Sequence, residues 1–197
     1  MEDHLRQHLS LWRHFDAAMN AAATIAAISR CTMTDREPLY PLVSRQELQL
    51  IDQLHGFAYN ARRAIELADD YEKGILNHAK GINLPGFAET HATLRFDEEP
   101  EPLADRSLWW FLGRIVHSRE LKIRPATRPQ VGSIWAGAPN ITVYQNAIAL
   151  AVRSDYDEPD ETHLAKIDEL LQGFLALRTR LERAIGLAVG EAAPPGG

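Results

Sequence analysis

The chain has 197 residues, of which 45% are hydrophobic and 24% charged, proportions typical of a globular protein with one domain. Its formal net charge of −6 argues against a protein that binds nucleic acid through an overall positive field, although a local basic patch is compatible with it. The single cysteine, Cys31, excludes an intrachain disulfide and fits a reducing compartment.

We expect a cytoplasmic protein with no membrane segment. The first residues, Met1 to His4, lack the basic stretch and the apolar run of a signal peptide. The longest weakly polar run, Ala21 to Ile28, is far shorter than the roughly 20 apolar residues that a membrane span needs.

Two long helices are predicted in the first third of the chain. The first covers residues 3–29, where large and small apolar residues recur at helical spacing: Trp12, Phe15, Met19, Ala22 and Ala26. Pro38 and Pro41 then interrupt the pattern. The second helix covers residues 44–70 and is expected to begin at a capping box formed by Ser44 and Glu47.

The middle of the chain alternates between loop, helix and strand patterns. Residues 80–103 carry turn and breaker residues in "GINLPG" and "DEEPEP", and a third helix is predicted over 104–121. Between 125 and 155, "ITVYQ" and "IALAVRS" alternate apolar and polar residues as strands do, which predicts a hairpin or a three-stranded piece. The segment "NAIALAV" is also compatible with a short helix.

A last helix is predicted over residues 161–188, where apolar residues again step by three and four, and "EAAPPGG" at 191–197 reads as a disordered tail. The expected fold is therefore mainly α: a four-to-five-helix bundle in one domain over 1–190, with a small β-hairpin insertion at 125–155 before the last long helix.

The third predicted helix carries a second face that is not simply apolar. Leu108, Phe111 and Ile115 share the arc that should face the core, whereas Trp110, Arg114 and His117 step by four and three along the other side. A tryptophan on such a face usually has a partner, which is either another segment of the chain or another chain.

The end of this helix, "GRIVHS", resembles the HEPN superfamily of small helical bundles, which occur in toxins and in anti-phage and RNA-processing systems. In that family an arginine, followed after a short spacer by a histidine, forms a metal-independent ribonuclease site across a dimer interface. The resemblance implies that His117 exchanges protons with the ribose hydroxyl and that Arg114 stabilises the charged phosphorane. The chain departs from the motif at Leu112, where the family arginine falls at the shortest spacing.

Two other interpretations of this segment remain open. His117, Arg119 and Lys122 are cations of the kind favoured at a helix C-terminus, which is a purely structural role. Alternatively, the Trp110 face anchors a homodimer or docks a protein partner.

Three further arginines are candidate RNA-binding residues. Arg62 and Arg63 lie on the second predicted helix, where pairing with Glu66 on a solvated face is the plainer interpretation. Arg178 interrupts the apolar stripe of the last helix, where it either extends to solvent or binds an acidic group or a phosphate.

No metal or cofactor is predicted. The acidic run "DYDEPDE" lacks EF-hand spacing, and no Glu-x-x-His pair or phosphate-binding glycine motif occurs. The two functional hypotheses are thus a HEPN-like protein that acts on or binds RNA, as an active or a degenerate metal-independent ribonuclease of a defence or toxin system, and a non-enzymatic interaction module that dimerises or docks a protein partner. Substrate, partner, pathway and oligomer size are not encoded in any motif of the sequence.

Overall fold

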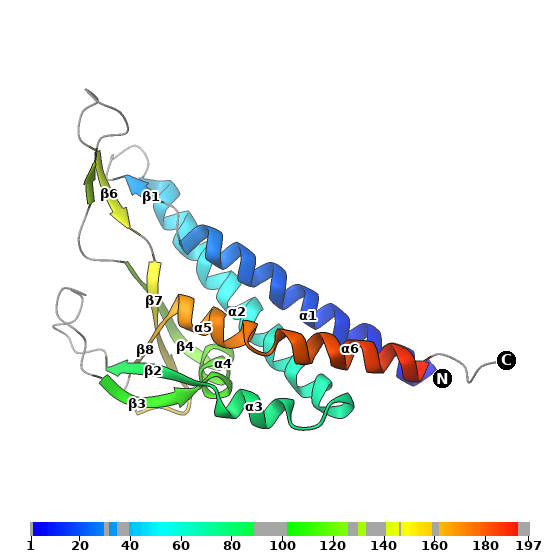
Figure 1. Ribbon diagram of the computed structural model, residues 1–197. Helices are drawn as coiled ribbons and strands as arrows, with labels where there is room; N and C mark the ends of the chain where they lie inside the picture. The colour runs from blue at the N-terminus through cyan, green and yellow to red at the C-terminus, as the bar shows by residue number, and fades with distance from the viewer. Residues whose placement is uncertain are drawn as a thin grey trace.

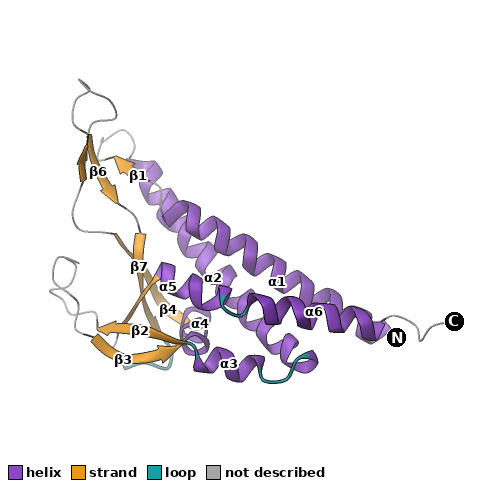
Figure 2. Ribbon diagram, in the orientation of Figure 1, coloured by secondary structure: helices purple, strands orange, loops and turns teal. Residues whose placement is uncertain are grey.

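A computed structural model describes the protein over residues 2–29, 32–34, 40–88, 102–125, 130–132, 141–145, 147–158 and 162–192. Within these segments the chain is mainly helical, with six helices and two small antiparallel sheets (Figures 1 and 2). None of the helices described is long and apolar enough to cross a membrane.

The two longest helices form an antiparallel pair. Helix α1 spans Glu2–Ser29, as the periodicity predicted, and α2 spans Tyr40–Tyr71. The predicted start of α2 was wrong: Ser44 and Glu47 lie inside the helix, because a proline such as Pro41 is compatible with a first helical turn, whose N–H groups have no intrahelical acceptor. Buried alanines on both helices, among them Ala18, Ala22, Ala58 and Ala61, let the pair pack closely.

A sharp turn links α2 to the short helix α3, Ile75–Gly81. Gly74 has a φ of 89°, a left-handed conformation that residues with a Cβ adopt only at a cost. Asp69 stabilises the turn, since its Oδ1 accepts hydrogen bonds from the backbone N–H groups of Gly74 (2.8 Å) and Leu76 (3.1 Å). The residues that follow were predicted as loop over 80–103, but β2 occupies Asn83–Ala88 and pairs with β3, Pro102–Ser107.

The third predicted helix is shorter than its periodicity suggested. Helix α4 spans Leu108–Val116, and Ser107 caps it by accepting a hydrogen bond from Trp110 N at 3.2 Å. The chain leaves the helix at His117 and continues as β4, Ser118–Pro125. Arg119 and Lys122 therefore lie on a strand and not in a last helical turn, and of the three cations only His117 lies at the helix C-terminus.

Five strands form the larger sheet, in the order β3-β2-β8-β7-β4. Strand β7, Ala147–Ser154, pairs with β4 on one side and with β8, His163–Lys166, on the other. Strand structure between 125 and 155 was predicted, and β7 confirms "IALAVRS" as a strand. The predicted single helix over 161–188 was wrong, because β8 comes first and two helices follow, α5 (Ile167–Leu175) and α6 (Arg178–Ala192).

The smaller sheet has the order β1-β6-β5 and lies at the end of the α1–α2 pair away from the start of α1 and the end of α6 (Figure 1). It consists of β1 (Thr32–Thr34), β5 (Gln130–Gly132) and β6 (Ile141–Gln145). Residues 191 and 192 of the predicted tail belong to α6, and the rest of that tail lies outside the described residues.

The core lies between the helices and one face of the larger sheet. Helices α1, α2 and α6 pack side by side, while α4 and α5 lie between them and the strands (Figure 1). Phe57 of α2 meets Phe174 of α5 edge to face, with ring centroids 5.2 Å apart. Leu150 and Val152 of β7 belong to the same cluster, so the sheet is a layer of the core and not an insertion beside it.

Candidate functional site

A surface pocket of about 390 Å³ lies where α4 meets α2 and the turn after β7. We call it the α4 pocket. Aromatic and cationic side chains dominate its lining, which consists of Arg62, Trp109, Trp110, Gly113, Arg114, His117 and Tyr156. Four of the predicted site residues, Arg62, Trp110, Arg114 and His117, are thus brought together.

The guanidinium of Arg114 is held by the turn after β7. Its Nη1 donates a hydrogen bond to Ser154 Oγ at 2.7 Å, and its Nη2 lies 3.0 Å from Asp157 Oδ1. Both partners are inside the protein, since only 1% of the Asp157 side chain and 17% of the Arg114 side chain are exposed. The positive charge of Arg114 is therefore compensated within the chain.

The Asp157 carboxylate is the centre of this network. Burial raises its pKa, but the backbone N–H and the hydroxyl of Ser154, which donate at 2.7 and 2.8 Å, together with the charges of Arg114 and His163, outweigh that effect. The pKa of Asp157 consequently lies below its ordinary value. His163 Nε2, from β8, is 3.4 Å from Asp157 Oδ1, so the network joins α4 to two strands.

Trp110 has its partners within its own chain. The guanidinium carbons of Arg114 and Arg106 lie 4.6 and 5.2 Å from its ring centroid, which is cation–π geometry. The rings of His163 and Phe111 meet it edge to face, with centroids 4.7 and 5.1 Å away. The sequence predicted that this tryptophan contacts either another segment of the chain or another chain, and the structure shows contacts with another segment.

His117 and Tyr156 form the solvent-facing side of the pocket. His117 ends α4, with its backbone N–H donating to Gly113 O at 3.1 Å, and its side chain is exposed. Its ring meets that of Tyr156 edge to face at 5.4 Å. Tyr156 is 69% exposed, so one aromatic face at the pocket is open to a ligand.

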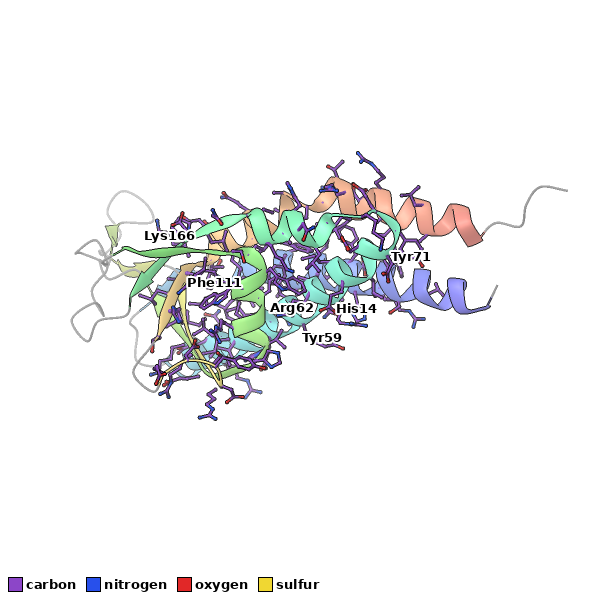
Figure 3. The ribbon with its side chains drawn as sticks, turned by 90° about the horizontal axis from the view of Figure 1, so that it is seen from below. His14, Tyr59, Arg62, Tyr71, Phe111 and Lys166 are labelled. Carbon is purple, nitrogen blue, oxygen red and sulfur yellow. The ribbon has the colours of Figure 1, made fainter. Side chains whose placement is uncertain are left out.

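Arg62 reaches the pocket from α2. Its guanidinium carbon lies 4.0 Å from the ring centroid of Trp109, on α4. Figure 3 shows Arg62 beside α4, with His14 and Tyr59 further along the α1–α2 pair. The predicted pairing on the solvated face is confirmed for Arg63, whose Nη1 is 2.7 Å from Glu66 Oε2, whereas Arg62 is 3.9 Å from the same carboxylate.

Three predicted binding residues do not line the pocket: Arg63, described above, Arg119 and Arg178. Arg119 lies on β4 and pairs with Asp155, both side chains being largely exposed. Arg178 begins α6, is exposed, and pairs with Glu182 at 2.7 Å. In the sequence the acidic run "DYDEPDE" lacks EF-hand spacing, and neither Asp157 nor Tyr156 was predicted as a site residue. The only sequence signal for them was a tyrosine and several carboxylates together just after a predicted strand.

The chemistry available at the α4 pocket is that of cations, an imidazole and aromatic rings. Across the described segments, no group of three or more His, Cys, Asp or Glu side chains is placed to hold a metal ion. Guanidinium groups bind phosphate oxygens, an imidazole exchanges protons, and an open phenol ring stacks on a base.

Comparison with models of known protein families, with characterised proteins and with solved structures found no match.

Proposed function

We propose that the chain binds single-stranded RNA at the α4 pocket and that it cleaves RNA weakly or not at all. The observation that carries this proposal is the gathering of Arg62, His117 and the exposed ring of Tyr156 around one pocket. Single-stranded RNA is recognised by stacking its splayed bases on aromatic side chains while cations follow its backbone. The net negative charge of the chain is no obstacle, because these groups form a local site.

The state of Arg114 supports binding over cleavage. In the HEPN-like reading, Arg114 stabilises the charge that develops on the phosphorane while His117 transfers protons. Asp157 already lies 3.0 Å from Arg114 Nη2, and Ser154 occupies Nη1, so the cation has little capacity left for a phosphate. The proposed protein is therefore a degenerate, metal-independent ribonuclease of the HEPN-like kind, which binds RNA but cleaves it weakly or not at all.

Binding is tested by fluorescence anisotropy with a labelled single-stranded RNA in EDTA. Stacking of one base contributes roughly 1–3 kcal/mol, so Tyr156→Ala should weaken binding about 5- to 150-fold. The matched control is Tyr59→Ala, which removes another exposed tyrosine, 52% exposed, from α2. Equal affinities of the two variants would contradict this site.

Cleavage is tested in the same buffer with total RNA and a His117→Ala control. We expect little or no cleavage, and any that occurs should survive EDTA and be abolished in His117→Ala. Robust metal-dependent cleavage, or full activity of His117→Ala, would overturn the assignment.

The alternative function is an interaction module that dimerises or docks a partner through the Trp110 face. In this alternative the residue that would contact the partner is no longer Trp110. Because Trp110 packs against Arg114 and His163, the exposed aromatic ring on that face is Tyr156. Tyr156→Ala that reduces self-association but leaves RNA affinity unchanged would favour this alternative.

A further inference from the structure

Gly113 lies on α4 one turn before the C-cap residue His117, so the two residues lie on the same side of the helix. A Cβ placed on Gly113 would collide with Nη1 of Arg62. The guanidinium of Arg62 thus occupies the space that a side chain at position 113 would fill, although it comes from a different helix. The absence of a side chain at 113 is what lets an α2 arginine lie against this face of α4.

The two arginines of the α4 pocket differ in how closely other groups of the chain compensate their positive charge. Arg114 has a buried carboxylate at 3.0 Å and a hydrogen bond to Ser154. Arg62 has a carboxylate only at 3.9 Å, because Glu66 is engaged by Arg63 at 2.7 Å. Among the residues that the structure describes, the Arg62 guanidinium makes no hydrogen bond within the chain, and 24% of its side chain is exposed.

The Trp109 ring fixes where this cation lies. With its carbon 4.0 Å from the ring centroid, the planar guanidinium covers the indole face and keeps its N–H groups free to meet an anion. A guanidinium presents paired donors that match two phosphate oxygens, which a lysine in the same place would not do.

We propose that Arg62, and not Arg114, is the phosphate-binding cation of the α4 pocket, and that Gly113 is the residue that admits it. Resting on the proposed function, this assigns the ligand class: a phosphodiester of single-stranded RNA, contacted by Arg62 beside His117, with an adjacent base stacked on Tyr156. Arg114 is a positioning residue that ties α4 to the turn carrying Tyr156.

The salt dependence of RNA binding separates a phosphate contact from a general charge effect. Each phosphate contact to a single strand contributes about 0.7 to the slope of log affinity against log salt. Arg62→Ala should reduce this slope by about 0.7 and weaken binding on the order of tenfold at low salt. The matched control is Arg183→Ala, which removes the same charge from α6 at a side chain that is 63% exposed and lines no part of the pocket.

Gly113→Ala tests the same phosphate contact without replacing Arg62. Among the described residues, the only side chain that the added methyl group meets is the flexible end of Arg62, so the helix should form as well as before while the guanidinium is displaced. We expect a loss of affinity similar to that of Arg62→Ala, and little further loss when the two changes are combined.

The outcomes distinguish this inference from the proposed function. A wild-type chain that does not bind RNA at low salt refutes both. A wild-type chain that binds, with Arg62→Ala and Arg183→Ala giving equal slopes, or with Gly113→Ala binding as wild type, refutes the Arg62 assignment and leaves RNA binding standing. A loss of slope in Arg62→Ala and of affinity in Gly113→Ala supports it.

Discussion

Replacement of the buried Asp157 by asparagine should destabilise the fold far more than the same change at a neighbouring residue. The asparagine oxygen can still accept from Ser154, but the amide carries no charge to compensate Arg114. Removing one partner of a buried ion pair costs about 3–5 kcal/mol, and because 17% of the Arg114 side chain is exposed we expect a lower value, about 2–4 kcal/mol. Asp155→Asn breaks only the exposed pair with Arg119 and should cost under about 1 kcal/mol.

The effect of Asp157→Asn should also depend on pH. The folded-state pKa of Asp157 lies below its ordinary value of 3.8, so the stability that its ionised form contributes is fully present above that value. It is lost as the pH falls through the lower folded-state pKa. The difference between wild type and variant should therefore shrink below about pH 4.

Urea denaturation followed by circular dichroism measures both quantities, with equal m values as the check that the unfolding transitions are comparable. Equal free energies of unfolding for Asp157→Asn and Asp155→Asn would refute the buried network. A difference that grows on acidification would refute the direction of the pKa shift.

Three further predictions concern the turn after α2, the core and the oligomeric state. Gly74→Ala should cost about 1–2 kcal/mol in thermal unfolding, because its φ of 89° disfavours a Cβ, and an unchanged melting temperature would argue against that turn. Phe174→Ala should lower the free energy of unfolding by about 3–5 kcal/mol, because Phe174 is buried. Leu175→Ala, at the half-exposed neighbouring residue, should lower that free energy far less. The homodimer implied by the family resemblance should appear in sedimentation, and a monomer at high micromolar concentration would reject it.

The two long N-terminal helices could be predicted from the sequence because their apolar stripes run for many turns. Over such lengths the helical period is unambiguous, and local sequence decides the structure. The sequence also predicted a mainly helical chain with strand structure after Arg124, and the structure confirms both. The expected capping box at Ser44 shows the limit of local signals, since a start signal inside a strong stripe does not stop the helix from beginning earlier.

The errors fall where pairing across the sheet decides between two compatible patterns. Leu121 fits the apolar stripe of α4, but it also alternates with Ile123, and the pairing of β4 with β7 selects the strand. Leu164 likewise fits the stripe of the last helix, yet it pairs with Ala151 in the sheet. Such choices depend on residues far along the chain, which periodicity in a short window does not contain.

Only part of the candidate site could be predicted from the sequence, for the same reason. Helical spacing places Arg114 and His117 on one face, and the structure brings both to the α4 pocket. Compensation of the Arg114 charge depends on Asp157, and the access of Arg62 depends on Gly113, and helical spacing indicates neither relation. These relations join separate elements and emerge only from the folded chain.

The turn after β7 has a consequence for the thermodynamics of ligand binding. Its backbone is fastened before any ligand arrives: Tyr156 N donates to Ser154 Oγ at 3.2 Å, and Asp155 N donates to His117 O at 3.3 Å. A loop that becomes ordered only on binding loses conformational entropy at that moment, and each immobilised side chain costs about 0.5–1.5 kcal/mol. Here folding has already ordered the backbone beneath the exposed ring, so an arriving base meets a preorganised surface, and the complex should gain its affinity with little change in loop mobility.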